Sequence, residues 1–466
     1  KQIEKAIEAG LGARIAWERQ PLESRAEIML KAADLCADKY RMDLVATTML
    51  GQGKTVVQAE IDAAAELIDF LRFNAFFALQ LLQYQPISPS QDIQNRLIYR
   101  GLEGFVAAIS PFNFTAIGGN LASCPAMMGN TVMWKPSPTA LLSNYVTFKI
   151  LREAGVPPSV IQFLPTEPPS VFGDTITAHP ALAAINFTGS VPVFRHLTRQ
   201  VGENLANYHT FPRLVGECGG KNFHFIHSSA DVDTVAAATV RGAFEYSGQK
   251  CSATSRMYVP KSMWPQLKEK MSEIMKQMKV AGPEDWESFT SAVIDKKSFQ
   301  RIKGYLDSAS SSPNVKVVEG GKCDDSTGYF VQPTILETTD PNEKVMREEI
   351  FGPVLTILPY DEAKCEETLK SVKDSTPYGL TGAVFAEDTS FLEQAKTELM
   401  DAVGNLYLND KSTGSIVGQQ PFGGARLSGT NDKAGGPHYV LKWASPQTIK
   451  QTFVPLHQWK YPSMEN

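Results

Sequence analysis

Cys251 is the residue of this chain best suited to nucleophilic chemistry. It follows Gly248-Gln-Lys250 and precedes Ser252, between a predicted helix end and a predicted strand. Because the thiolate is the form that attacks a carbonyl carbon, a cysteine in this setting can react if its pKa is lowered. A buried, inert cysteine fits the same residues, and both interpretations stay open at this point.

Two further residues could complete such a site. Glu217 is followed by Gly219-Gly220, which leave room for close approach, so its carboxylate could act as a general base that activates water. Asn113 carries an amide that could stabilise an oxyanion, a contribution of about 2.7–4 kcal/mol in other enzymes. A merely solvated Glu217 fits the residues as well, and Cys218 beside it is expected to pack rather than react.

Polar, glycine or proline residues follow the apolar strands predicted in the first half of the chain. They form the segments Ser110-Pro-Phe-Asn113, Lys135-Pro-Ser137 and Thr188-Gly189-Ser190. Ligands of open α/β sheets bind at this edge, and a helix that begins after Ser190 would offer free N–H groups to a pyrophosphate. The usual GxGxxG fingerprint does not occur, so the residues alone leave nucleotide binding open.

The elements that must position these residues alternate between helix and strand. The first eighty residues are predicted to be helical. Short apolar strands at 105–109, 131–134, 160–163 and 183–187 then alternate with helical patterns, which is typical of a parallel, doubly wound sheet. A second α/β region runs from Glu217 to about Gly424 and contains a predicted helix over 231–246.

Two stretches favour contacts between subunits. From Pro86 onward, polar and apolar residues alternate in a pattern that predicts a hairpin with one solvated face. A second alternating stretch at 440–449 predicts a strand with nothing left in its own domain to pair with. Exposed ribbon edges invite pairing, so the sequence predicts a dimer or a larger assembly.

Composition limits the partners of this chain. Its 466 residues exceed the ~250–300 at which single cores stop growing, so two or more domains are expected. The net charge of −5 gives no field for nucleic acid, and the longest charge-free run, 104–134, is interrupted by proline, glycine and asparagine. We expect no nucleic-acid partner and no membrane partner. We also expect no metal site, since the histidines and cysteines lack the spacing of metal ligands.

The six cysteines are interpreted as thiols. The first residue is lysine rather than methionine, which indicates a removed or cropped leader.

Seven motifs, in this order over nearly the whole chain, resemble the aldehyde dehydrogenase superfamily. That resemblance implies an α/β fold with a variant Rossmann NAD-binding domain, an α/β catalytic domain and a β oligomerisation ribbon. It also accounts for the missing GxGxxG. The motifs are Ser110-Pro-Phe-Asn113, Lys135-Pro-Ser137, Phe187-Thr-Gly-Ser190, Glu217-Cys-Gly-Gly-Lys221, Gly248-Gln-Lys-Cys251, Glu348-Glu-Ile-Phe-Gly-Pro-Val354 and Pro421-Phe-Gly-Gly424.

The resemblance implies a role for each matched residue. Cys251 would be the nucleophile, Glu217 the general base and Asn113 the oxyanion donor, together with the backbone N–H of Cys251. NAD would be the cofactor. The residues implied to bind it are Ser110, Lys135 at the adenosine ribose, Gly189, Ser190 at the pyrophosphate, and Glu349 with Phe351 at the nicotinamide ribose.

Within the superfamily, the segments 410–425, 428–433 and 435–439 resemble the Δ1-pyrroline-5-carboxylate dehydrogenases, or glutamate γ-semialdehyde dehydrogenases, most closely the mitochondrial animal enzymes. The resemblance implies NAD-dependent oxidation of glutamate γ-semialdehyde to glutamate in proline and ornithine catabolism, in the mitochondrial matrix. Cys218 and Pro138 differ from the residues that many relatives carry at these positions. Because of Pro138, the preference for NAD over NADP is implied by the subfamily resemblance and not by a residue. Another aldehyde dehydrogenase and a catalytically silent relative are the alternatives. The residues implied to bind the substrate are Ser252, Gly414, Ser415 and Phe422.

The same resemblance predicts the domain organisation. Residues 1–85 and 103–219 would form the NAD-binding domain, and 220–425 the catalytic domain. Residues 86–102 and 426–466 would form an oligomerisation hairpin and a C-terminal strand, which favours a homodimer or a larger assembly.

Overall fold

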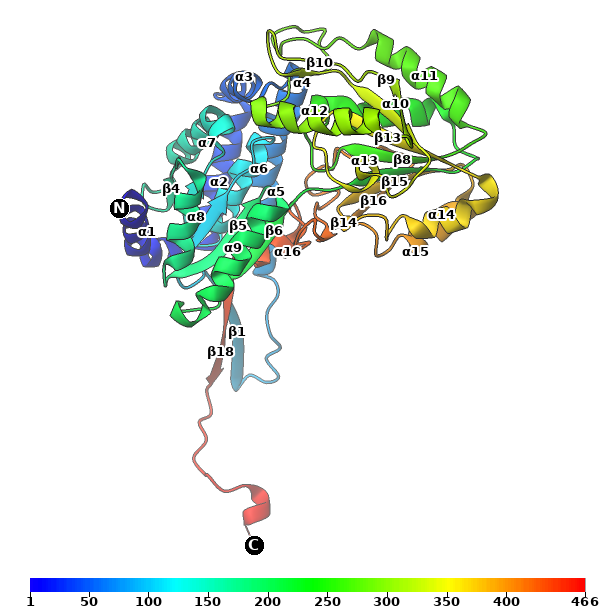
Figure 1. The fold of residues 1–466 in the computed structure, drawn as a ribbon. Coiled ribbons are helices and arrows are strands. Elements are labelled where there is room, and N and C mark those ends of the chain that lie inside the picture. Colours follow the sequence, from blue (N-terminus) through cyan, green and yellow to red (C-terminus); the bar gives the residue numbers. More distant parts are fainter. Residues whose placement is uncertain (466) are drawn as a thin grey trace.

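The computed structural model describes residues 1–465 as two α/β units, with a two-stranded ribbon that projects from the first unit (Figure 1). Each unit is built around a mainly parallel sheet with helices on both faces. The family-like α/β architecture expected from the sequence is therefore present.

The first sheet has five parallel strands in the order β4-β3-β2-β5-β6. Its strands are β2 (Phe105–Ile109), β3 (Thr131–Lys135), β4 (Ile161–Phe163), β5 (Leu182–Thr188) and β6 (Arg213–Glu217). Every residue of β3 and β5 is buried, as expected of parallel strands that are covered on both faces. The four strands predicted in this region are confirmed, and β6 adds a fifth.

Helices cover both faces of this sheet, as the alternation along β2 shows. They are α1 (Gln2–Glu18), α2 (Leu22–Ala37), α3 (Arg41–Gln52), α4 (Val56–Ala59), the π-helix η1 (Glu60–Ala65), α5 (Glu66–Leu81), α6 (Thr115–Met127), α7 (Leu141–Ala154), α8 (Pro169–Ala178) and α9 (Val191–Glu203). Val106 and Ala108 pack with α2, α5, α6 and α7, whereas Phe105 and Ala107 pack with α1, α8 and α9. The helical prediction for the first eighty residues is confirmed.

The second sheet has seven strands in the order β16-β15-β7-β8-β13-β12-β9, of which only the edge strand β9 runs antiparallel to its neighbour. Its strands are β7 (Asn222–Ile226), β8 (Thr254–Pro260), β9 (Val315–Glu319), β12 (Thr334–Thr338), β13 (Val354–Tyr360), β15 (Thr381–Phe385) and β16 (Asn405–Leu408). Its helices are α10 (Val232–Phe244), α11 (Trp264–Gln277), α12 (Lys296–Ser311), α13 (Lys344–Arg347), α14 (Cys365–Ser371) and α15 (Thr389–Glu398). Short two-residue strands occur as β10 (Cys323–Asp324), β11 (Phe330–Val331), β14 (Tyr378–Gly379) and β17 (Ala425–Arg426).

The ribbon corrects the prediction of a local hairpin at 86–102. The strand β1 (Ile93–Arg100) pairs antiparallel with β18 (Ser445–Thr452), from Ile93 opposite Thr452 to Arg100 opposite Ser445. The turn-forming residues before β1 lead into the strand instead of joining two strands, so the partner comes from the far end of the chain. The predicted C-terminal strand exists, and beyond it residues 453–465 extend away from the body (Figure 1).

The chain passes from the first sheet to the second between β6 and β7, and later returns. The short helix α16 (Pro437–Leu441) packs against α5, and Trp443 lies fully buried in the core of the first unit. Residues 437–444 therefore belong to the first unit in packing, although the sequence placed them with the oligomerisation segment.

Three further observations within residues 1–465 concern disulfides, membrane-spanning helices and metal sites. All six cysteines are free thiols, as predicted. Within the described part of the chain, no helix has both the length and the apolar character needed to cross a bilayer, and no cluster of His, Cys, Asp and Glu could hold a metal ion.

Asn130 should contribute strongly to stability because it joins three segments. Its Oδ1 accepts from the Leu102 N–H at 2.8 Å, and its Nδ2 donates to the carbonyls of Pro125 and Trp443, both at 2.8 Å. We expect Asn130→Ala to lower the free energy of unfolding by about 3 kcal/mol, since buried polar groups would lose their partners. Urea unfolding measures this change. The exposed Asn207→Ala serves as the control, and an equal loss in both variants would contradict the assignment.

Candidate active site

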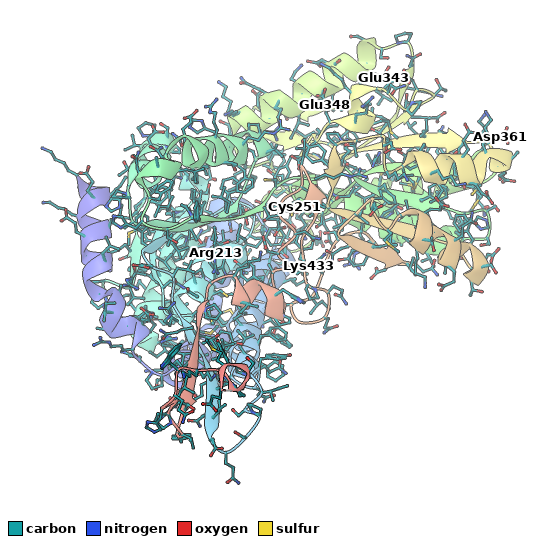
Figure 2. All side chains as sticks on the ribbon, turned by 90° about the horizontal axis from the view of Figure 1, so that it is seen from below. Arg213, Cys251, Glu343, Glu348, Asp361 and Lys433 are labelled. Atoms are coloured by element: carbon teal, nitrogen blue, oxygen red, sulfur yellow. The ribbon has the colours of Figure 1, made fainter. Side chains whose placement is uncertain are left out.

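A cavity of about 280 Å³ lies where the two units meet. It is lined by η1 and α5, by the ends of β5 and β6, by the loop before β8, and by residues from 413 to 439. Figure 2 shows Cys251 at the junction of the two units, with Lys433 on the same side of the molecule. Because the carboxyl ends of parallel strands point into such junctions, polar side chains that follow different strands converge there.

Cys251 and Glu217 face each other in this cavity. The Cys251 Sγ lies 3.9 Å from the Glu217 Oε1, a distance at which the thiol donates a hydrogen bond to the carboxyl group. Burial raises the pKa of the Cys251 thiol well above its ordinary value, and the nearby charges of Glu217 and Glu349 raise it further. A lowered pKa would make the Cys251 thiol reactive at rest, as considered from the sequence, whereas this arrangement holds a protonated thiol.

Glu217 is also held in its neutral form near neutral pH. Burial raises its pKa to about 8, although the charge of Lys433 and the hydrogen bond from Cys251 act in the opposite direction. Lys433 lines the same cavity and its Nζ donates to the carbonyls of Gly404 at 2.6 Å and Gly423 at 3.0 Å. A carboxyl group with a pKa near 8 can take up and release protons at working pH, which suits a general base.

The loop that carries Cys251 is held in place by Asn222, the first residue of β7. The Asn222 Nδ2 donates to the carbonyls of Cys251 at 2.7 Å and Ala253 at 2.8 Å, and its Oδ1 accepts from the Thr381 N–H at 3.1 Å. Gly248 has a φ of +65°, and a Cβ there would lie 2.2 Å from the Gly352 carbonyl oxygen. The loop conformation therefore requires glycine at this position.

Asn113 is buried beside this loop. Its Nδ2 donates to the carbonyl of Gln249 at 3.0 Å, two residues before Cys251. Asn113 is not among the residues of the described chain that line the cavity, although the next residue, Phe114, is. The amide is thus near the nucleophile, and its oxyanion role stays a prediction.

The four residues predicted to bind substrate all lie in the same cavity as Cys251. Ser252, Gly414, Ser415 and Phe422 line it together with Cys251 and Glu217. The Ser252 hydroxyl contacts the Thr413 hydroxyl at 2.6 Å. The residue after Cys251 is therefore in direct contact with the residue before Gly414. Two residues 161 positions apart in the chain are thus in contact, and the substrate-binding role of the four residues stays a prediction.

The predicted cofactor residues of the first unit lie at the carboxyl edge of its sheet, where Ser110 follows β2 and Lys135 ends β3. The Ser110 hydroxyl accepts from the Trp134 indole N–H at 2.6 Å. Burial lowers the pKa of Lys135, whose Nζ donates to the Pro136 carbonyl at 3.2 Å. Gly189 and Ser190 connect β5 to α9, and the exposed Ser190 forms no side-chain cap, so the first N–H groups of α9 stay free for an anion.

Glu349 and Phe351 belong to the second unit and reach the crossing between the two sheets. The Glu349 Oε1 accepts from the Gly220 N–H at 3.0 Å, and burial raises the pKa of this carboxyl group to about 7. Phe351 has a φ of +53° and packs edge-on against Phe112 at 5.9 Å between ring centroids. The structure thus places Glu349 beside the segment that follows Glu217, and its predicted contact with ribose stays a prediction.

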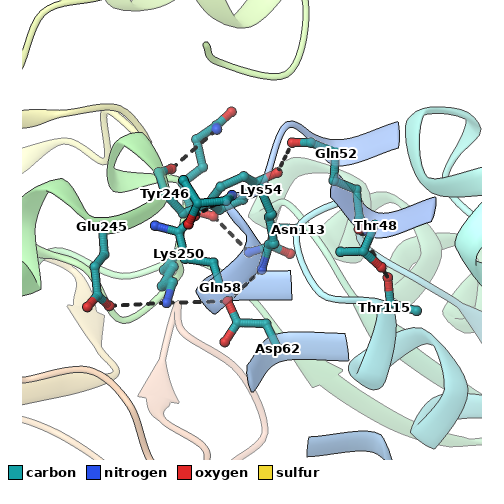
Figure 3. A network of polar contacts seen from close by, with 12 residues as sticks. Thr48, Gln52, Lys54, Gln58, Asp62, Asn113, Thr115, Glu245, Tyr246 and Lys250 are labelled. Atoms are coloured by element: carbon teal, nitrogen blue, oxygen red, sulfur yellow. Dashed lines mark hydrogen bonds and ion pairs between the residues drawn. The ribbon is translucent and has the colours of Figure 1, made fainter. Parts of the chain in front are cut away.

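The sequence did not indicate a buried ionic network that includes Lys54, Asp62, Glu245 and Lys250, the residue before Cys251 (Figure 3). The Lys54 Nζ lies 2.6 Å from the Asp62 Oδ2, and the Lys250 Nζ bridges Asp62 at 3.3 Å and Glu245 at 3.4 Å. Burial opposes ionisation of Asp62, but the two lysines hold its pKa below the ordinary value. No local pattern in the sequence indicates this network, because Lys250 lies 188 residues from Asp62.

Glu66 is a second residue that the sequence did not single out. It lines the cavity, and its Oε2 is buried without a hydrogen-bond partner among residues 1–465. Burial and the nearby Asp62 raise the pKa of Glu66 well above its ordinary value. The π-helix η1, which precedes it, lies in the same wall, and such segments are frequent at functional sites.

The aldehyde dehydrogenase family model matches residues 1–449. This chain belongs to the aldehyde dehydrogenase family. It is 61% identical over 464 residues to the mitochondrial Δ1-pyrroline-5-carboxylate dehydrogenase of Homo sapiens, covering 99% of this chain and 82% of that protein. It is 60% identical over 463 residues to the enzyme of the same name from Danio rerio, covering 99% and 83%.

Solved structures of this family agree with the fold. The Δ-pyrroline-5-carboxylate dehydrogenase of Mycobacterium tuberculosis bound with NAD matches with a TM-score of 0.94 and 46% identity, covering 99% of this chain and 85% of that chain. The Thermus enzyme with bound NAD matches with a TM-score of 0.91 and 34% identity, covering 97% and 86%. The predicted family and the predicted aldehyde dehydrogenase fold are confirmed.

Alkylation of Cys251 should report on its coupling to Glu217. The ionised carboxylate raises the pKa of the thiol, so Glu217→Gln should react severalfold faster with iodoacetamide at about pH 9, where Glu217 is charged. At about pH 6 the two proteins should differ less, because Glu217 is then protonated. Mass spectrometry of the Cys251 peptide measures both rates. The exposed Glu348→Gln is the control, and equal rates for Glu217→Gln and the parent at the higher pH would refute the coupling.

Proposed function

We propose that this chain oxidises L-glutamate γ-semialdehyde to L-glutamate with NAD as the electron acceptor, in proline and ornithine catabolism. The observation that carries the proposal is the placement of Cys251 and Glu217, 3.9 Å apart, in one cavity with Ser252, Gly414 and Ser415. The relatives at 60% and 61% identity are mitochondrial Δ1-pyrroline-5-carboxylate dehydrogenases, which supports the same substrate and the mitochondrion as the compartment.

The cavity suits an aldehyde that carries an amino-acid head. The Ser252 and Ser415 hydroxyls and the backbone around Gly414 offer hydrogen-bond donors to a carboxylate, and Phe422 provides an apolar wall. Backbone donors bind a carboxylate without an arginine. We assign these four residues to the substrate head.

The first chemical step uses Cys251. Its thiol releases the proton to solvent, and the sulfur then forms a bond to the aldehyde carbon as the carbonyl π electrons move to the oxygen. The Asn113 amide and the Cys251 backbone N–H are assigned to that oxyanion. This step gives the anion of a thiohemiacetal and needs an ionised Cys251, whose pKa is raised, so it should be favoured as the pH rises.

The residues at the edge of the first sheet fit NAD. The uncapped N-terminus of α9 behind Ser190 suits a pyrophosphate, the buried Lys135 amine and the Glu349 carboxyl group suit ribose hydroxyls, and Ser110, Gly189 and Phe351 lie beside them. When bound, NAD accepts the hydride that leaves the substrate carbon. Glu217 then takes a proton from a water molecule that attacks the resulting thioester, which releases glutamate and returns Cys251 to the thiol.

A self-associated form, a homodimer or larger, is part of the proposal. The ribbon formed by β1 and β18 projects from the body, and Ile98, Phe453 and Val454 on or beside it are exposed. An exposed ribbon with apolar side chains is an edge that pairs readily with another chain. A second copy of this chain would cover both the edge and the apolar side chains.

Substitution of Cys251 and Glu217 should separate the two halves of the reaction. We expect Cys251→Ala to form no NADH from glutamate γ-semialdehyde while it still binds NAD, because the nucleophile that attacks the aldehyde is gone. Glu217→Gln should slow thioester hydrolysis more than NADH formation, so a burst of NADH precedes a slow steady state. Stopped-flow absorbance measures both. Retained turnover in Cys251→Ala would show that Cys251 is not the nucleophile. A parent enzyme that prefers succinate semialdehyde would refute the proposed substrate.

Truncation before β18 should test the assembly. We expect the full chain to be a dimer or larger in light scattering, and a chain that ends at Ala444 to shift toward the monomer, because β1 loses its partner strand. A chain that ends at Thr452 keeps the ribbon and serves as the matched control for the exposed tail. A monomeric full chain at working concentration would overturn the prediction.

A further inference from the structure

A polar side chain lies in the middle of a strand where an apolar one is expected. β7 is an interior strand of the second sheet, and all five of its residues are buried. Phe223 and Phe225 point to one face and pack with aromatic and aliphatic side chains, so His224 lies on the opposite face together with Asn222. A buried imidazole is costly unless its nitrogens are hydrogen-bonded, so the partners of His224 show what it is there to hold.

Both ring nitrogens of His224 have partners. The Ser412 backbone N–H donates to Nε2 at 3.2 Å, and the Thr254 hydroxyl lies 2.9 Å from the same nitrogen. Because a backbone N–H can only donate, Nε2 must be the acceptor, which places the ring proton on Nδ1. Nδ1 lies 2.9 Å from the Thr239 hydroxyl, which in turn lies 3.8 Å from the Met257 sulfur. The imidazole is therefore neutral in one tautomer, and burial lowers its pKa to about 3.

The two partners of Nε2 belong to the two walls of the cavity. Thr254 begins β8, directly after the loop that carries Cys251 and Ser252, whereas Ser412 precedes the cavity-lining residues Thr413, Gly414 and Ser415. Hydrogen bonds between side chains and backbone also join the two walls directly. The links are Thr254 Oγ1 to Ser412 Oγ at 3.0 Å, Ser412 Oγ to the Ser252 carbonyl at 3.3 Å, and Ser252 Oγ to Thr413 Oγ1 at 2.6 Å.

We propose that His224 is a positioning residue for substrate specificity, which holds the segment 412–415 at the distance from Ser252 that the amino-acid head of the substrate requires. This inference rests on the proposed function, since it takes 412–415 as the segment that binds that head. His224 touches neither the substrate nor Cys251 and acts through Ser412 and Thr254.

Asn222 and His224, both on β7, hold different segments of the site, so the role of His224 can be tested apart from general support of the site. Asn222 holds the carbonyls of Cys251 and Ala253, so the nucleophile keeps its own anchor when His224 changes. Loss of the His224 contacts should therefore weaken recognition of the carboxylate head more than the attack on the aldehyde carbon. A purely structural role would reduce activity toward every aldehyde alike.

The experiment compares His224→Leu and His224→Gln with the parent on two aldehydes, glutamate γ-semialdehyde and propanal, which has no carboxylate. In His224→Leu the Ser412 N–H loses its acceptor, so we expect the ratio of kcat/KM for the semialdehyde over propanal to fall about tenfold, mainly through KM. His224→Gln supplies an amide oxygen as acceptor and should recover most of that ratio. His227→Gln is the matched control, because His227 lies just beyond the same strand, away from the cavity, and contacts Ser229.

A second readout does not depend on turnover. Calorimetric titration with L-glutamate, the product, should show about tenfold weaker binding to His224→Leu than to the parent. If His224→Leu does not fold, Thr239→Val removes the acceptor of the Nδ1 proton by a nearly isosteric change and should shift both measurements in the same direction. Equal losses on both aldehydes, or an unchanged ratio with unchanged glutamate binding, would overturn the role of His224. A parent enzyme that is inactive on the semialdehyde would instead overturn the proposed function.

Discussion

The bidentate contact of Asn222 with the loop of Cys251 is the interaction on which the site depends. A loop that joins a helix to a strand is normally free to move, and a nucleophile must be held within a fraction of an ångström to react. One amide that binds the carbonyls of Cys251 and Ala253 transfers the rigidity of the interior strand β7 to that loop. Because the Thr381 N–H holds the same amide from β15, three chain segments must be in register before the sulfur is in place.

Burial then sets the chemistry of the site at rest. The same low-dielectric surroundings raise the pKa of Cys251 and of Glu217, so both groups carry protons near neutral pH. Two adjacent negative charges would repel each other in such a place, and the protein avoids that state. A thiol that keeps its proton near neutral pH is a weak nucleophile, which protects the buried sulfur from indiscriminate reactions.

Much of this arrangement could be predicted from the sequence where the signal is local. Strands such as 105–109 are continuous apolar runs, and the residues that follow them mark the edge where ligands bind, so Ser110 and Lys135 could be placed from the sequence alone. The same local reasoning failed for 86–102, because β1 finds its partner 345 residues later and no turn chemistry records that pairing. Lys250 and His224 were missed as members of networks for the same reason: Asp62 and Ser412, their partners, lie 188 residues away in each case.

The return of the chain to the first unit closes the cavity and brings a positive charge to it. The Cys218 N–H donates to the Ser428 carbonyl at 2.9 Å and the Thr430 N–H to the Gly216 carbonyl at 2.9 Å, so this segment lies against the strand that ends in Glu217. The next turn places Lys433, whose ammonium is held by backbone carbonyls and is not paired with Glu217 by any ion pair described within residues 1–465. A lysine bonded directly to Glu217 would fix it as a carboxylate and weaken it as a base. Held apart, Lys433 lowers the pKa of Glu217 only in part and leaves it near 8, where it can exchange protons.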